Sequence, residues 1–187
     1  MRDFANVDIC QVNSLESRLP ITQYPDLLQQ DLSIVSLSPR ADRADLAFWA
    51  AESGLPTATL ADWHQVIDWV FATYGPIVDA VKSQAAYARR LNYDDVSAAD
   101  AAPLFGRHAG GEELSDTERK PLEDHLMRYC IAKAAEAGLP IKLHCVYYAG
   151  HDRMPLDRVR RNAGDLSPLL ADFPNAKFVL MHIGYPY

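Results

Sequence analysis

Short apolar runs alternate along this chain with longer stretches in which apolar residues recur at helical spacing. The short runs are typical of buried strands and cover residues 32–37, 77–81, 139–144 and 177–182. The stretches of helical spacing cover residues 41–53, 60–74, 115–137 and 156–173. Strands that alternate with helices form parallel sheets, because each crossover helix returns the chain to the same edge. The sequence therefore predicts an α/β fold of parallel strands with covering helices.

Two of the predicted helices carry clear start signals. Thr59 and Asp62 form one capping box, and Ser115 and Glu118 form another. After the first box, one apolar stripe at helical spacing follows, made of Trp63, Val66, Ile67, Val70, Phe71 and Tyr74. Residues 91–111 show neither the helical nor the strand pattern, and this stretch is too long for a plain connection. We therefore expect an insertion with its own structure or an active-site loop.

Composition narrows the class of protein. A length of 187 residues suits a single domain over residues 1–187. A net charge of −7 disfavours binding to nucleic acid or to an anionic membrane. No apolar run approaches a membrane span, and the first residues do not resemble a secretory signal. Cys10, Cys130 and Cys145 are widely spaced, so we expect free thiols and a cytoplasmic protein.

Polar residues stand at the carboxyl ends of three predicted strands: Lys82, His144 and His182. In parallel α/β folds these ends, and the loops after them, form the functional site. Imidazoles from neighbouring strand ends can bind one divalent ion. A single histidine there would more often cap its strand, and Lys82 could be a solvated cation, but two histidines in equivalent positions favour a metal site. The lysine could also form a Schiff base or, once carbamylated, bridge two metals.

Residues 80–83 (AVKS), 141–144 (IKLH) and 178–186 (FVLMHIGYP) resemble strands four, five and six of amidohydrolase-superfamily barrels. The similarity is greatest to the branch that also contains uronate-isomerase-like and decarboxylase-like members, and residues 162–174 resemble it too. The resemblance covers residues 75–187 and implies a (β/α) TIM-type barrel.

The resemblance also implies roles for the strand-end residues. His144 would be a metal ligand, and His182 would bind a second metal or contact the hydrolytic water. Lys82 would be carbamylated and bridge the metals. The implied cofactor is a divalent metal, most readily zinc, with manganese, iron or nickel as alternatives. The implied protein is a metal-dependent hydrolase in which activated water attacks the carbonyl of a small amide, ester or lactone.

Two departures from the superfamily pattern leave other interpretations open. The sequence contains no His-x-His, and it ends after its sixth-strand equivalent, before the strand-eight aspartate. A complete barrel needs about 250 residues, so we expect an incomplete one. The alternatives are a related metal-dependent decarboxylase or sugar-acid isomerase, or a non-catalytic partial barrel. Because an incomplete sheet exposes its edges, we expect a homo-oligomer, at least a dimer.

Residues just past the two histidine strands are candidates for substrate binding. Tyr147 and Tyr185 would line the mouth of a pocket, and Arg153 could contact an anionic small-molecule substrate. Core packing for the tyrosines and a solvated loop for the arginine are the alternatives. His64 and His125 fall within helices and are predicted to be partly exposed, with no assigned role.

Overall fold

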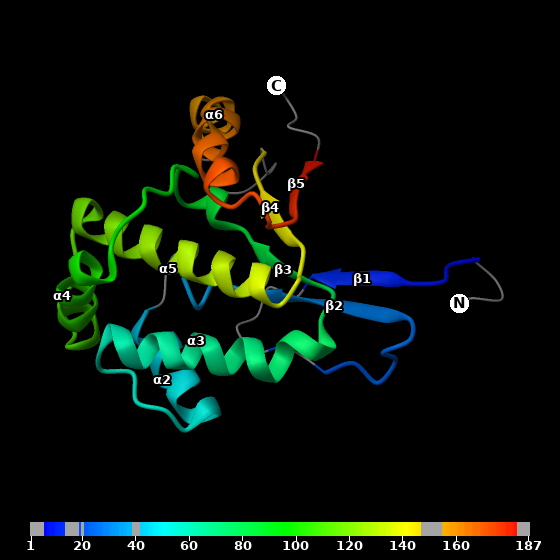
Figure 1. The fold of residues 1–187 in the computed structure, drawn as a ribbon, viewed down its shortest axis with the longest axis horizontal. Helices are drawn as coiled ribbons and strands as arrows, with labels where there is room; N and C mark the ends of the chain where they lie inside the picture. Colours follow the sequence, from blue (N-terminus) through cyan, green and yellow to red (C-terminus); the bar gives the residue numbers. More distant parts are fainter. Residues whose placement is uncertain (1–5, 14–18, 20, 39–41, 147–154, 183–187) are drawn as a thin grey trace.

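The computed structural model describes residues 6–13, 19, 21–38, 42–146 and 155–182, which contain one parallel sheet with helices packed against it (Figure 1). The strands are β1 (Cys10–Asn13), β2 (Leu28–Ser33), β3 (Ala80–Ser83), β4 (Ile141–His144) and β5 (Phe178–Met181). The helices are α2 (Arg43–Ser53), α3 (Leu60–Tyr74), α4 (Ala98–Ala109), α5 (Asp116–Glu136) and α6 (Leu156–Asp172), with short 3₁₀ turns η1 (Gly75–Ile77) and η2 (Ala85–Tyr87).

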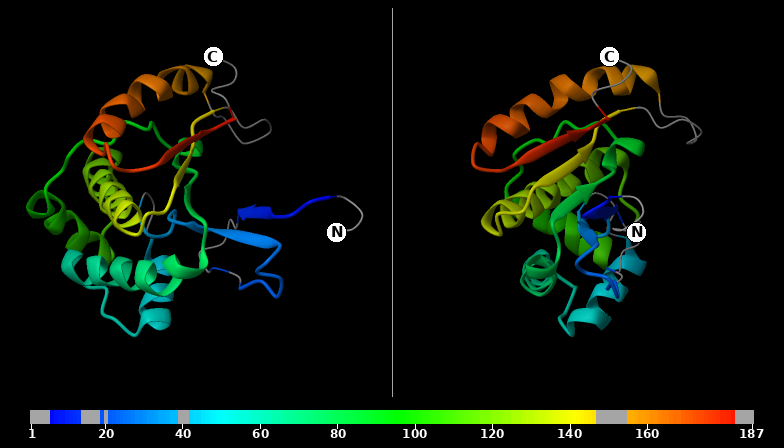
Figure 2. Two further views of the ribbon diagram at one scale, coloured as in Figure 1. Left: turned by 45° about the vertical axis from the view of Figure 1, so that its right-hand side comes forward. Right: turned by 90° about the vertical axis from the view of Figure 1, so that its right-hand side faces the viewer.

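The strands pair in chain order, β1-β2-β3-β4-β5, and every pair is parallel. Figure 2 shows that the strands follow an arc, with the helices on its outer side. Strand order, parallel pairing and helix placement are those of a (β/α) barrel that is partly built. The predicted fold class, an incomplete TIM-type barrel, is therefore confirmed for the described residues.

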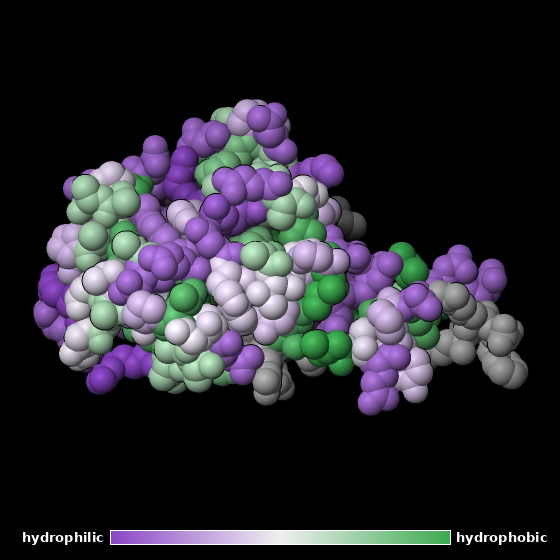
Figure 3. Space-filling model, turned by 60° about the horizontal axis from the view of Figure 1, so that its bottom comes forward, coloured by the Kyte–Doolittle hydropathy of each residue, from purple (hydrophilic) through white to green (hydrophobic). Residues whose placement is uncertain are grey.

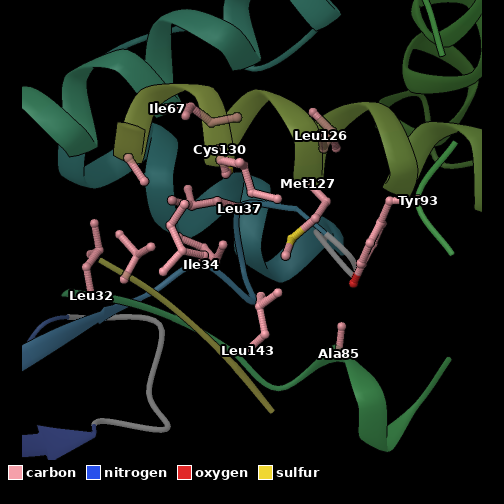
Figure 4. Close-up of a cluster of buried hydrophobic side chains, with 14 of the residues drawn as sticks. Leu32, Ile34, Leu37, Ile67, Ala85, Tyr93, Leu126, Met127, Cys130 and Leu143 are labelled. Carbon is pink, nitrogen blue, oxygen red and sulfur yellow. The ribbon is translucent and has the colours of Figure 1, made fainter. Parts of the chain in front are cut away.

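The two faces of the sheet differ because successive strand residues point to opposite sides. On the outer face, Leu32, Val81, Ile141 and Leu143 are at most 2% exposed and belong to the apolar core. Figure 4 shows Leu32 and Leu143 beside the side chains that α3 and α5 contribute to this cluster, among them Ile67, Leu126 and Cys130. Burial of this apolar face against the helices holds the helices to the sheet.

The inner face carries polar and charged residues instead. Lys142 on β4 donates to both carboxylate oxygens of Asp31 on β2, at 2.8 and 2.9 Å, and to Gln11 on β1 at 2.6 Å. The ion pair crosses β3 above Ala80, whose small side chain lies beside Asp31 in the register. This contact joins three strands from inside the arc.

The structure confirms four predicted helices and shifts two of the predicted strands. Strand β2 ends at Ser33 rather than at 37, because the amides of Leu37 and Ser38 donate to Ile34 and turn the chain. Strand β3 begins three residues late, because η1 extends the turn after α3. The segment 91–111 does have its own structure, since α4 starts after the Ser97 cap. Strand β1 was not predicted.

The described part of the chain contains no helix that is both long enough and apolar enough to cross a membrane. Among the same residues, Cys130 and Cys145 are buried thiols and Cys10 is an exposed one.

Trp63 connects α3 to the segment after β2, and its removal tests this packing. The indole is fully buried, and its Nε1 donates to the Leu37 carbonyl at 3.0 Å. We expect Trp63→Phe to lower the free energy of unfolding by about 1–3 kcal/mol, because it leaves a buried carbonyl without its donor and a small void. Urea denaturation would measure the loss. Trp69→Phe, at a half-buried position on the same helix, should cost less; equal losses would contradict this account.

Candidate metal centre

His144 and His182 converge at the carboxyl ends of two neighbouring strands. His144 is the last residue of β4 and lies opposite Met181 in the register, and His182 follows Met181 directly. The His144 Nδ1 and His182 Nε2 atoms are 3.1 Å apart, and the ring centroids are 4.8 Å apart. The sheet thus brings together two residues that are 38 positions apart in the sequence.

The surroundings of His144 fix its tautomer. Its Nε2 lies 2.9 Å from the Val146 carbonyl oxygen, which can only accept, so Nε2 carries the proton. The Nδ1 lone pair therefore faces His182. The Tyr87 ring packs edge-on against the imidazole, with centroids 4.4 Å apart, and its hydroxyl lies 3.5 Å from Nδ1. A carbonyl on the far ring nitrogen is the usual way in which proteins orient a metal-binding histidine.

His144 is neutral at neutral pH. Its pKa is lowered to about 4, mainly by burial and also by the neighbouring His182 and Lys82, while the hydrogen bond to Val146 opposes them. A neutral imidazole has the free lone pair that metal coordination requires.

His182 has an unusual backbone conformation, with φ at +69° in the left-handed region. Residues with a Cβ rarely adopt this conformation, although histidine does so more often than most. Strain of this kind persists where the surrounding structure requires it and is often found at functional sites. Here it ends β5 and directs the imidazole toward His144.

Lys82 lies on the inner face of β3, level with Lys142 on β4. Lys82 as a whole residue is 2% exposed, and its Nζ donates to the Met181 sulfur. Burial lowers the pKa of Lys82 below its ordinary value, with Lys142 adding to the effect and Asp31 opposing it. The ammonium thus reaches the residue that precedes His182, and all three predicted strand-end residues gather at one place.

The two histidines fit a divalent metal. Two nitrogens bound tetrahedrally to one zinc ion, each about 2.0–2.1 Å from it, are roughly 3.3 Å apart. The observed separation of 3.1 Å is close to this value. Within the described ranges, no group of three or more histidine, cysteine, aspartate or glutamate side chains could hold an ion. The histidines therefore supply two donors, and a further ligand has to be of another kind or origin.

The predicted substrate-binding residues Tyr147, Arg153 and Tyr185 lie outside the described residues. Tyr87, which contacts His144, was missed by the sequence analysis. Its only signal was its place in the loop after β3, five residues beyond Lys82.

A cavity of about 380 Å³ lies apart from the histidine pair, between the segment after β2, α4 and the start of α5. Its lining includes Phe105, Leu122 and Leu126 together with Arg43 and Arg119. None of Lys82, His144 and His182 lines it, so it is not the pocket of this centre.

The fold and the strand-end histidines agree with a family match. The family described as Amidohydrolase matches residues 11–187, and the chain belongs to this family. Protein fluG of Emericella nidulans is 30% identical over 122 residues, which are 60% of this chain and 14% of that protein.

Solved structures share the fold. Uronate isomerase from Thermotoga maritima matches with a TM-score of 0.69 at 12% identity, over 92% of this chain and 42% of its own. Glucuronate isomerase from Caulobacter crescentus matches with a TM-score of 0.67 at 11% identity, over 97% of this chain and 42% of its own. A structure described as a metal-dependent hydrolase from Lactobacillus casei matches with a TM-score of 0.60 at 21% identity, over 86% of this chain and 39% of its own. The chain thus spans about two fifths of the structures that it matches.

The lowered pKa of His144 predicts a pH dependence in the metal-free protein. Its pKa of about 4 lies below the 6.5 of an unfolded histidine, so the folded state binds fewer protons between these values. The free energy of unfolding should therefore fall as the pH drops from about 6.5 to about 4. NMR titration of the imidazole protons, assigned with His144→Asn, would measure the midpoint.

The variant His182→Asn should raise the pKa of His144, because it removes a neighbouring imidazole that lowers this pKa. Burial, the larger cause, remains in that variant and keeps the pKa below its ordinary value. A His144 midpoint at 6.5 or higher in the unmodified chain would refute this electrostatic account.

Proposed function

We propose that this chain contributes to a metal-dependent hydrolase of the amidohydrolase type, acting on the carbonyl of a small amide, ester or lactone. The observation that carries the proposal is the convergence of His144 Nδ1 and His182 Nε2 at 3.1 Å on adjacent strand ends. A divalent metal bound there would supply Lewis-acid activation of water and of the carbonyl. We expect zinc, with manganese, iron or nickel as alternatives.

The chain's own residues would hold and orient this centre. His144, locked by Val146, would supply a neutral nitrogen donor, and His182 would supply the second and contact the attacking water. Lys82 has a lowered pKa, so a larger share of its amine is neutral and able to react with carbon dioxide. The resulting carbamate would supply the oxygen donors that the two histidines leave missing. Tyr147, Arg153 and Tyr185 remain our candidates for the substrate pocket.

A non-catalytic partial barrel is the second candidate. It is favoured by the small number of ligands, because the described residues supply two imidazoles and no cluster of three. A decarboxylase or sugar-acid isomerase would use the same histidines, so assays of amide, lactone and carboxylate substrates side by side would separate these reactions.

Metal content tests the proposed centre. We expect dialysed protein to retain zinc or another divalent metal, and His144→Ala and His182→Ala each to lose one equivalent, because each removes one of two protein nitrogens. Plasma mass spectrometry would measure this content. His108→Ala, a histidine on α4, should leave the content unchanged.

Unchanged metal content in both His144→Ala and His182→Ala would refute the centre. Protein without metal in any sample, even after supplementation with zinc, would support the non-catalytic partial barrel.

We also propose that the chain associates with itself. Strand β5 forms one edge of the sheet, and its Val179 and Leu180 are 43% and 45% exposed. Ile9, Ile21 and Ile77 are also exposed. Figure 3 shows hydrophobic residues on the surface where the arm that carries β1 and β2 meets the body. Exposed edges and apolar patches of this kind favour association.

Light scattering tests this association. We expect a mass of at least twice 20.8 kDa, and partial dissociation in Leu180→Lys, because a charge on the exposed edge strand opposes pairing. A monomer at micromolar concentration would contradict the prediction.

A further inference from the structure

A second pair of histidines lies away from the sheet, between two helices. His64 on α3 and His125 on α5 are 61 residues apart in the sequence, and their Nε2 atoms are 3.0 Å apart. Both side chains are half-buried. Neither residue belongs to a strand end, so the proposed hydrolase function leaves this pair unexplained.

The orientation of His125 is fixed by the backbone. Its Nδ1 lies 2.8 Å from the Val96 carbonyl oxygen, just before α4, and therefore donates to it. In a neutral imidazole this leaves a lone pair on Nε2, the atom that faces His64. The backbone carbonyl thus plays the same part for His125 that the Val146 carbonyl plays for His144.

The ring of His64 is also held in place. It stacks on Tyr129, one turn after His125 on α5, with centroids 3.9 Å apart and planes within 6°. The Tyr129 hydroxyl donates to Asp68, one turn after His64 on α3, at 3.0 Å, and Lys133 pairs with the same carboxylate at 3.2 Å. The two helices therefore present the two imidazoles from a cross-linked polar cluster.

The geometry directs one nitrogen of each ring toward the other. His64 can carry its proton on Nδ1, as His125 does, so that the two Nε2 lone pairs face each other across 3.0 Å. Because the pair is half-buried, water can complete the coordination of an ion there.

We propose that His64 and His125 form a second divalent transition-metal site, which links α3 to α5 and is separate from the strand-end centre. Two imidazoles plus water suit Zn²⁺, Ni²⁺ or Cu²⁺. The ion would stabilise the packing of these helices, because it binds the folded arrangement and not the separated helices.

The test uses the full chain with the strand-end pair removed. In metal-free His144→Gln/His182→Gln protein, we expect Ni²⁺ or Zn²⁺ titration to show about one bound equivalent. At roughly 100 times the dissociation constant, the Tm should rise by about 5–10 °C. Adding His64→Gln or His125→Gln should abolish both the binding and the rise, while adding His108→Gln should change neither. The readout is the metal-dependent shift in Tm, which a general loss of stability does not mimic.

Two results would overturn the site: an unchanged shift in the His64→Gln and His125→Gln proteins, or no binding in the background variant. The second result would leave a direct hydrogen bond between the two imidazoles as their only link. If the His144→Gln/His182→Gln protein does not fold, His64→Gln and His125→Gln are made in the unmodified chain instead. Each substitution must then remove one equivalent of bound Ni²⁺. Because the strand-end centre is tested by His144→Ala and His182→Ala alone, failure of either site is distinguishable from failure of the other.

Discussion

The in-register parallel pairing of β3, β4 and β5 is the constraint on which both the core and the candidate metal centre depend. Because side chains alternate along a strand, the same register that sends Val81, Ile141 and Leu143 into the apolar core sends Lys82, Lys142 and His144 to the inner face. A slip of one residue would exchange the two sets, burying charge against the helices and exposing apolar residues. The energy that fixes the fold therefore also fixes the positions of the site residues.

Charges on the inner face are satisfied by few partners. One carboxylate, Asp31, accepts two hydrogen bonds from Lys142 and also attracts Lys82. Burial lowers the pKa of Lys82, because a charge removed from water is costly, and Lys142 adds to this effect while Asp31 opposes it. Burial thus leaves Lys82 closer to the neutral amine that the proposed reaction with carbon dioxide requires.

Sequence reasoning succeeded where a local signal matched the final environment. The capping boxes at Thr59 and Ser115 form as predicted, and the apolar runs that end in His144 and His182 are neighbouring strands. It failed where tertiary contacts override local composition. The mostly polar residues Leu-Gln-Gln-Asp do not resemble a buried strand, yet they begin β2, because Asp31 forms an ion pair with Lys142 on β4. The contacts of Tyr87 with His144 and of His64 with His125 depend on the fold, so periodicity could not reveal them.

The two histidine pairs share a construction but differ in their charged neighbours. In each, one imidazole is locked by a backbone carbonyl and another nitrogen lies 3.0–3.1 Å away. The strand-end pair is next to the cation Lys82, which lowers the pKa of His144, whereas the helical pair is next to Asp68, which acts to raise the pKa of His64. Carbamylation of Lys82, as we propose, would replace the positive charge at the strand ends with a negative one that favours a bound cation. The Asp68 carboxylate likewise favours retention of a cation at the proposed helical site.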